Sequence, residues 1–481
     1  MTENLAAMAG GVRAPEARLE PDAIGVAQDT VIGMANAAPG VSVGLTLAAL
    51  AAATAYGSGP IILLTAIPML IIANAYRRLN LWNANCGASF EWVGRSINPY
   101  LGFMTGWLMV TGSLIGTVSG VIVLAPSVLA IFGSNATSTF DNVVISTLVI
   151  LVMLTIAILG IRLTAQTQVG FAAIEYVILI GFAIVGLAFV LGHHAHTVPV
   201  TSGWFSPTGV GGHGDMAAGF LAAVFMYTGW DGTVYVNEET KHRRVNPGRA
   251  AMLAVIFLAI IFTFVTVGLQ GVLGRKALAA TGNDGTTLVA VAHVLGGSGW
   301  EKVMALALAL SVIGSTGTGI VLIARLTYGM ASHRTLPEVL SNVSQRFHTP
   351  AVATAIIGLI LIIATWLFLL TSSIQNAFFE VVDVTGILYA AFYVLTAFAT
   401  IVYFRRRVIG DFWSAVVLGV LPLAAAAFLI WLLVKSVMSA SGIEDWTMII
   451  VLVVGVILLF IARFGLRSSF FRLPRESDAG A

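Results

Sequence analysis

The stretch Phe225-Met-Tyr-Thr-Gly-Trp-Asp-Gly232 decides how this chain folds, because it places a carboxylate inside an apolar segment, 216–236, that is otherwise fit to cross a membrane. A charged group in hydrocarbon persists only where it faces water or a partner, so Asp231 is a candidate functional residue. Gly229 and Gly232 flank it, and glycines allow a helix to leave regular geometry and expose backbone groups. We therefore predict a broken membrane helix with a binding role.

The composition is that of a polytopic membrane protein. Of the 481 residues, 58% are hydrophobic and only 10% are charged, whereas about a quarter of the residues in a soluble domain are charged. A membrane-spanning helix needs about 20 apolar residues. Twelve runs meet this requirement, at 24–54, 57–75, 98–131, 143–161, 168–192, 216–236, 250–272, 298–324, 351–371, 377–403, 412–436 and 446–465.

The basic residues predict the orientation of these spans. An even number of spans puts both termini on one side, and loops rich in arginine and lysine mark the cytoplasmic side. The terminal segments and the even-to-odd loops hold 20 of the 24 basic residues, at Arg13, Arg18, Arg77, Arg78, Arg95, Arg162, Lys241, Arg243, Arg244, Arg249, Arg325, Arg334, Arg346, Arg405, Arg406, Arg407, Arg463, Arg467, Arg472 and Arg475. We expect a bacterial plasma-membrane protein with a cytosolic lead (1–22), which is not a signal peptide, and a cytosolic tail (467–481).

A second interruption lies in the first span, at Asn36-Ala-Ala-Pro-Gly-Val-Ser42. Pro39 lacks an N–H and its ring clashes with the carbonyl four residues back, so the helix should break around 35–40. Interrupted segments at matching positions of two halves are the best sequence indication of a transporter's binding site. This predicts an all-α membrane protein of 12 transmembrane helices, with a 5+5 inverted repeat. The expected units are 23–192 and 216–408, followed by two C-terminal helices in 409–466. A break that serves only close helix packing is the alternative.

The two breaks supply the candidate substrate-binding residues, which are Asn36, Ala37, Ala38, Pro39, Gly40, Val41, Ser42, Tyr227, Thr228, Gly229, Trp230 and Asp231. A third acid, Glu175, lies roughly 10 Å inside the fifth span, too deep for a short side chain to reach water easily. Burial favours a neutral carboxyl, which suits proton coupling by Glu175 together with Asp231. A glutamic acid that only hydrogen-bonds to a neighbouring helix is the alternative.

Two further groups are candidate functional residues, and each also has a purely structural interpretation. Ser315, Thr316 and Thr318 in the eighth span could supply oxygen ligands to a cation, or could allow close helix packing. Glu380 and Asp383 share a helix face near the outer end of the tenth span, where they could form a vestibule for cations or lie at the headgroup boundary. We expect acids but no lysine or arginine deep in the spans, and this favours protons or cationic groups as cargo.

Several classes of function are disfavoured. The single cysteine, Cys86, excludes intrachain disulfides and cysteine metal clusters. The net charge is +2 and the topology explains the basic residues, so nothing indicates nucleic-acid binding. No P-loop motif or covalent enzyme chemistry is visible, so we expect neither an ATP-driven pump nor an enzyme. We expect no metal site or cofactor; the coupling ion would be a proton, with sodium less favoured.

With these residues placed, the chain resembles the amino acid–polyamine–organocation superfamily of permeases over about residues 24–465. The stretches that carry the resemblance are Phe225 to Asp231, Asn237-Glu-Glu-Thr-Lys-His-Arg-Arg-Val-Asn-Pro247, Gly87-Ala-Ser-Phe-Glu-Trp-Val-Gly-Arg-Ser-Ile-Asn-Pro99 and Ser311 to Pro337. The resemblance implies a LeuT-like fold, with substrate held between broken helices 1 and 6. It also implies transport by alternating access.

The chain departs from the family pattern at two points. Ala38-Pro39-Gly40 stands where amino acid permeases commonly have a Gly-Ser-Gly-like turn, and Pro39 cannot donate to a substrate carboxylate. Glu175 stands near the position where some members carry a lysine. We expect a secondary active amino acid permease that works by proton coupling or exchange. The alternatives are a polyamine or other organic-cation importer and a non-transporting sensor. Expected partners are a small-molecule substrate and the lipid bilayer, with monomer and homodimer both open.

Overall fold

The computed structural model describes residues 18–134, 138–194, 197–281, 287–371, 378–439 and 442–478. The regular elements in these ranges are helices, and one isolated bridge pairs Ile24 with Thr240. The expected all-α membrane fold is confirmed.

The longer helices are α1 (Val26–Asn36), α2 (Pro39–Ala53), α3 (Ser58–Trp82), α5 (Pro99–Ile131), α6 (Thr139–Leu159), α7 (Ile161–Leu191), α8 (Met216–Met226), α9 (Asn246–Leu269), α11 (Thr287–Gly296), α12 (Ser298–Ser332), α13 (Ala351–Leu370), α15 (Phe378–Tyr403), α18 (Leu421–Ser439) and α19 (Ile443–Phe460). The shorter α-helices are α4 (Ser89–Ser96), α10 (Arg275–Thr281), α16 (Arg405–Gly410) and α17 (Phe412–Ala415). The 3₁₀ and π segments are η1 (Ser202–Phe205), η2 (Val210–Gly212), η3 (Trp230–Val236), η4 (Glu338–Ser341), η5 (Val416–Val420), η6 (Ile461–Gly465) and η7 (Ser469–Arg472).

Within the described residues, 11 helical stretches are long and apolar enough to cross a membrane, and each overlaps a predicted span. The remaining predicted span, 216–236, is not among them because it is divided into α8 and the 3₁₀ helix η3. Several helices extend past the ends of the predicted spans. The second span was expected to end at residue 75, but α3 continues to Trp82 and carries Arg77 and Arg78. The eighth span was expected to end at residue 324, but α12 continues to Ser332 and carries Arg325 inside the helix rather than in a loop.

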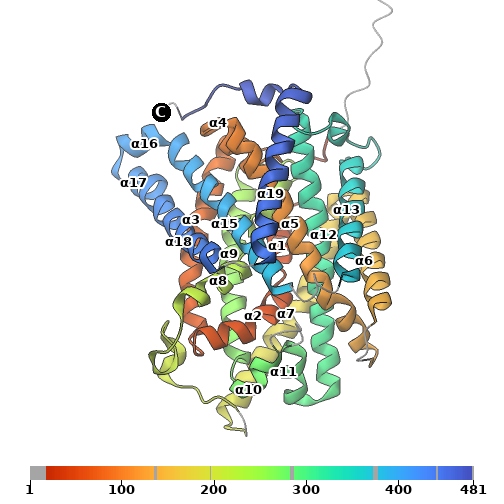
Figure 1. Cartoon of the computed structure of the whole chain (residues 1–481), viewed down its shortest axis with the longest axis vertical. Coiled ribbons are helices and arrows are strands. Elements are labelled where there is room, and N and C mark those ends of the chain that lie inside the picture. The colour runs from red at the N-terminus through yellow and green to blue at the C-terminus, as the bar shows by residue number, and fades with distance from the viewer. Residues whose placement is uncertain are drawn as a thin grey trace, which may run out of the picture.

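The membrane helices run between two faces of the molecule (Figure 1). We call the face formed by α4, α16 and the C-terminal end of α12 the inner face, and the face formed by α10 and α11 the outer face. Both ends of the described chain reach the inner face. Arg18 and Ser332 of α12 line the same pocket, and Asp478 donates its N–H to the Tyr403 carbonyl. The two ends of the described chain, Arg18 and Asp478, therefore lie on the same face.

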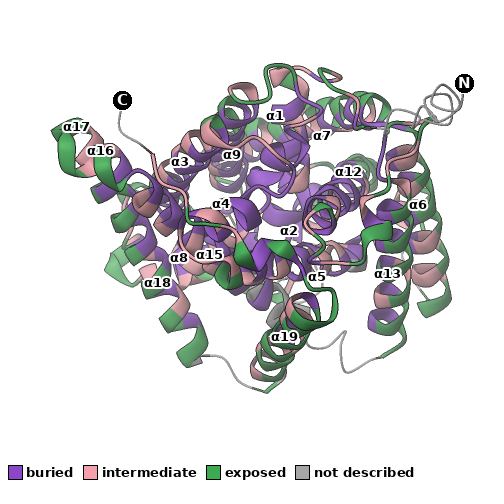
Figure 2. Ribbon diagram, turned by 90° about the horizontal axis from the view of Figure 1, so that it is seen from above, coloured by how far each residue is buried: buried purple, intermediate pink, exposed green. Residues whose placement is uncertain are grey.

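Burial divides the helices into a centre and a rim (Figure 2). In the most apolar part of Val26–Ala53 and of Ser298–Ser332, 83% of residues are buried, against 22% in Thr139–Leu159 and 17% in Asp445–Gly465. A rim helix that is apolar on every side suits contact with lipid. The interrupted segments therefore lie in the protected centre, where irregular backbone at membrane depth is tolerated.

Candidate functional site

The first break follows from the local sequence. α1 ends at Asn36 and α2 begins at Pro39, and Ala38 between them has φ 47° and ψ 65°, in the left-handed region that L-residues rarely adopt. Proline disfavours a right-handed helical backbone at the preceding residue, while its fixed φ and missing N–H suit the first position of a helix. The predicted interruption around 35–40 is confirmed.

The second break contacts the first directly. α8 ends at Met226 and η3 begins at Trp230, with Gly229 between them at φ 101°. A Cβ on Gly229 would lie 2.8 Å from the Asn36 Nδ2 atom, so glycine is needed for the space as well as for the backbone angle. Asn36 Nδ2 donates to the Gly229 carbonyl at 3.0 Å, although the two residues are 193 positions apart. The two predicted breaks therefore form one site.

Helix α7 brings Glu175 to the first break. Its side chain is 3% exposed, and the Gly40 N–H donates to its Oε1 at 2.8 Å. A carboxylate at a helix N-terminus is favoured both by the free amides and by the helix dipole. Glu175 therefore caps α2 from a helix that lies 135 positions away in the chain.

The other amides in the first turn of α2 are also used. The Val41 N–H donates to Ser311 Oγ of α12 at 3.3 Å, and the Ser42 N–H donates to the Ala38 carbonyl at 2.8 Å. Pro39 has no N–H to offer. Each donor in this turn thus has a partner within the chain.

Asp231 lies in the second break and is 1% exposed. Tyr393 of α15 donates its hydroxyl to Asp231 Oδ1 at 2.8 Å, and the Trp230 ring stacks on the Tyr393 ring at 5.3 Å. The Tyr235 hydroxyl lies near the same carboxylate.

A cavity extends from the two breaks toward the outer face. The residues that line it are Asn36, Ala37, Ala38, Val41, Ser42, Leu45, Ser113, Gly116, Thr117, Ser119, Gly120, Phe225, Thr228, Ser315, Thr385 and Tyr389. They come from α1, α2, α5, α8, α12 and α15 and from both breaks. No charged residue is among those of the described chain that line it.

The predicted site residues fall into two groups. Asn36, Ala37, Ala38, Val41, Ser42, Thr228 and Ser315 line the cavity, whereas Pro39, Gly40, Glu175, Tyr227, Gly229, Trp230, Asp231, Thr316 and Thr318 lie behind its wall. The Tyr227 hydroxyl, for example, donates to the Ile62 carbonyl at 3.2 Å. Thr318 donates to the Ser315 carbonyl at 3.1 Å, while the Thr316 hydroxyl is buried without a partner. The side chains of Glu380 and Asp383 lie outside the described residues.

Residues 29–462 match the amino acid permease family. The chain belongs to this family. Among curated proteins, the permease is 25% identical to an arginine/agmatine antiporter of Chlamydia felis over 365 residues, which cover 72% of this chain and 71% of the relative. It is 22% identical to a D-serine/D-alanine/glycine transporter of Escherichia coli K12 over 349 residues, covering 70% and 71%. It is 24% identical to the Asc-type amino acid transporter 1 of Mus musculus over 303 residues, covering 57% and 51%.

Toward the inner face, an aromatic layer closes the permease beneath the cavity. Tyr76, Trp230 and Tyr393 are fully buried, and their ring centroids lie 5.1 to 6.1 Å apart. Ser89 of α4 donates to the Tyr76 hydroxyl at 2.9 Å, which connects this layer to the inner face.

A buried ion pair forms the next layer. Arg325 of α12 donates from Nε to Glu239 Oε2 at 2.9 Å and from Nη2 to Oε1 at 3.0 Å, and both side chains are 0% exposed. Two parallel bonds of this kind are strong and geometrically specific. The expectation that no basic residue would lie deep in a span therefore needs correction at Arg325, because α12 is longer than its apolar run.

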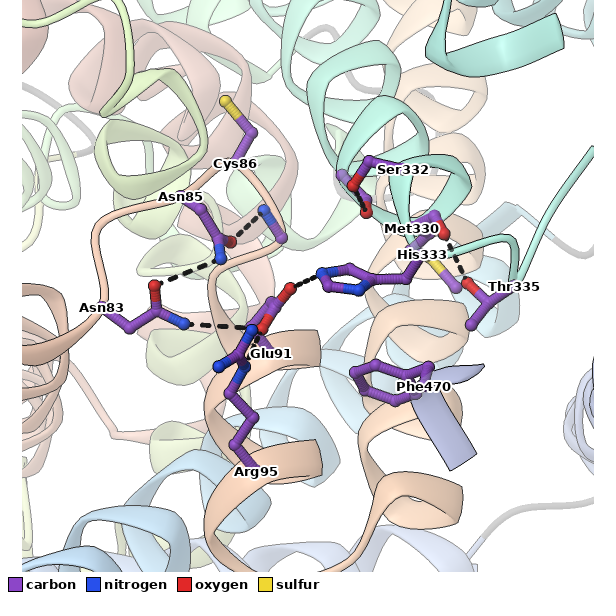
Figure 3. Close-up of polar contacts among 12 residues, drawn as sticks. Asn83, Asn85, Cys86, Glu91, Arg95, Met330, Ser332, His333, Thr335 and Phe470 are labelled. Carbon is purple, nitrogen blue, oxygen red and sulfur yellow. Dashed lines mark hydrogen bonds and ion pairs between the residues drawn. The ribbon is translucent and has the colours of Figure 1, made fainter. Parts of the chain in front are cut away.

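The last layer is a polar cluster around Glu91 of α4 (Figure 3). Glu91 is 1% exposed and pairs with Arg95 and with His333 at the end of α12, while Arg95 Nη1 donates to Glu476 Oε1 at 2.8 Å. Burial acts to raise the pKa of Glu91, but His333 and Arg95 outweigh it, so the pKa lies below its ordinary range. Beside this cluster, the Cys86 N–H donates to Glu238 Oε1 at 3.0 Å.

The sequence contained signals for some residues that we did not predict. Ser113, Gly116, Thr117 and Gly120 follow helical spacing on one face of α5, which is the pattern of a small, hydroxyl-bearing wall. Asp29 is fully buried in α1 and accepts a 3.3 Å hydrogen bond from Thr240, so the criterion that selected Asp231 applied to it as well. Tyr389, which lies 2.9 Å from Ser113 Oγ through its hydroxyl, had no comparable signal.

Proposed function

We propose that this permease is a secondary active transporter of an amino acid, with its inner face toward the cytoplasm of a bacterial cell. The observation that carries the proposal is the contact between the two breaks at Asn36 and Gly229, with a cavity on one side and three closed layers on the other. Relatives that carry amino acids support the substrate class. Alternating access requires this asymmetry, because only one side of the site can be open at a time.

The proton is the proposed coupling ion, and Glu175 is its proposed carrier. The Gly40 N–H holds the Glu175 carboxylate against the N-terminus of α2, at 2.8 Å. Protonation removes the negative charge that the helix dipole favours, so it weakens the attachment of α2 to α7. Since α2 lines the cavity, proton uptake at Glu175 would change the freedom of the first break to move.

Asp231 and Tyr393 are the proposed link between the cavity and the inner layers. Tyr389 lines the cavity, and its ring centroid lies 5.8 Å from that of Tyr393, which donates to Asp231. A ligand that displaces Tyr389 would therefore disturb the aromatic layer.

Reconstitution into proteoliposomes tests this function. We expect counterflow of at least one amino acid through the purified full chain, and accumulation when an inward proton gradient is imposed. Empty liposomes and liposomes with a proton ionophore are the controls. Counterflow without gradient-driven accumulation would mean that the permease is an exchanger. Absence of both, with folded protein, would contradict transport and favour a sensor.

A further inference from the structure

The first turn of α2 has no amide left for a ligand. Gly40 donates to Glu175, Val41 donates to Ser311, and Ser42 donates to a backbone carbonyl. In transporters with broken helices, the N-terminal amides of a half-helix are the usual partners of an anionic substrate group. In this permease the chain's own carboxylate, from Glu175, takes that place.

The hydroxyls that line the cavity offer acceptor sites. Five lining hydroxyls donate their protons to backbone carbonyls: Ser42 to Ala37, Thr117 to Ser113, Ser119 to Ile115, Thr228 to Phe225 and Ser315 to Val312, at 2.7 to 3.1 Å. A hydroxyl has one proton and two lone pairs, so each of these groups can still accept a hydrogen bond. Acceptors of this kind match an ammonium group, which has three donors and no acceptor.

The cavity also limits the charge and size of its ligand. No charged side chain lines it within the described residues, and its volume is about 60 Å³. A second ammonium group at the far end of a ligand would therefore have no counter-charge among the described lining residues. Desolvating an unpaired charge is strongly unfavourable, so ligands with two positive charges should bind poorly.

We propose that the permease recognises a small ligand through one primary ammonium group and makes no specific contact with a carboxylate. This inference rests on the proposed transport function and specifies the chemistry of the same site. An amino acid and the amine that lacks its carboxylate should then bind with similar strength. Transport of small monoamines follows as a further activity.

Paired ligands test this inference. Serine and ethanolamine, alanine and ethylamine, and the dication putrescine are titrated as competitors of counterflow in proteoliposomes and as stabilisers in thermal unfolding of the purified chain. We expect each monoamine to compete within about threefold of its amino acid, and putrescine to compete about tenfold less well, a difference of ~1.4 kcal/mol.

The failures of the two proposals are distinguishable. An amino acid that exchanges while its amine competes more than about tenfold less well overturns ammonium recognition and leaves the transport function intact. If no compound of either kind exchanges or stabilises the folded protein, both proposals fail.

A variant that frees an amide in the first turn of α2 gives a second test. Ser311→Ala frees the N–H of Val41, a residue that lines the cavity, so this variant should shift the preference toward the amino acid by about tenfold. The substitution removes only a hydroxyl. The matched control is Glu301→Gln, whose carboxylate pairs with His293 far from the cavity, and it should keep the wild-type ratio. An unchanged ratio in the folded Ser311→Ala variant would overturn the inference.

Discussion

The two breaks have one buried acid each, but they hold it in opposite ways. At the first break, the carboxylate comes from a distant helix and accepts from the backbone amide of Gly40. At the second, Asp231 belongs to the break itself and accepts from the Tyr393 side chain. The first acid thus completes a helix end, whereas the second is joined to a side chain of the aromatic layer.

This difference separates two functions that look equivalent in the sequence. An acid that caps a helix can control where that helix is attached, so we propose that Glu175 governs the position of α2. Asp231 lies between the cavity and the aromatic layer, so we propose that it governs the passage between them. Neither carboxylate lines the cavity. The comparison therefore predicts that mutating either acid affects movement more than ligand contact.

The largest effect is expected for Asp231→Asn. Replacing the carboxylate by an amide removes the charge that Tyr393 partners, so transport in both exchange and gradient-driven modes should fall about a hundredfold or more, which corresponds to at least ~2.7 kcal/mol. Uptake and counterflow in proteoliposomes measure both modes. Tyr393→Phe is the matched variant, because it removes only the donor, and it should produce a smaller loss in the same direction. Wild-type transport kinetics in Asp231→Asn would contradict the proposal that the second break takes part in transport.

Glu175→Gln should abolish gradient-driven accumulation and preserve exchange. Glutamine still accepts from Gly40 but cannot exchange a proton, so accumulation driven by a pH gradient should disappear while exchange between bound substrates persists. The measurement is paired uptake and counterflow from one preparation. Normal accumulation with normal pH dependence would make Glu175 structural. Loss of both modes would assign it to folding or binding.

Adding a methyl group at each break tests how much space is available there for a side chain. Gly229 has φ 101° and its Cβ would meet Asn36 at 2.8 Å, whereas a Cβ on Gly40 would lie 3.1 Å from Glu175 Oε1 and 3.3 Å from Ser311. Gly229→Ala should destabilise the permease by about 1–3 kcal/mol. Gly40→Ala should destabilise it less, because side chains can withdraw more easily than backbone. Thermal unfolding of the two purified variants gives the order, and the reverse order would refute the contact between the breaks.

The smallest effect on stability is expected at the polar cluster around Glu91, which lies between the second break and the inner face. Because the pKa of Glu91 is lowered in the folded protein, its carboxylate contributes stability above its ordinary pKa of 4.5, and this is lost as the pH falls through the lowered value. Glu91→Gln should therefore destabilise the permease by about 1–2 kcal/mol at pH 7 and by nothing measurable in strong acid. Thermal unfolding across pH tests this. If the difference in stability between the wild type and Glu91→Gln is the same at every pH, the ion pairs of Glu91 are not its source.

The sequence predicted the helical architecture and both breaks because proline, glycine and apolar length act locally. Pro39 specifies an interruption whatever surrounds it, and Asp231 between glycines does so almost as strongly. The partners of these residues depend on packing between distant segments. Nothing near Glu175 indicates that it would cap α2, and nothing near Arg325 indicates Glu239 as its partner. The cavity wall from α5 follows a helical pattern of small residues, but the same pattern also serves helix packing.

Cys86 gives the permease a native chemical reporter. Its side chain is fully buried at the inner face, and burial together with the neighbouring Glu238 and Glu239 raises the pKa of the thiol, which makes it unreactive toward alkylating reagents in this conformation. It is also the only thiol in the chain. Opening of the inner face would separate Cys86 from Glu238 and admit water, so the rate of maleimide labelling at this one atom would follow the transport cycle without any engineered label.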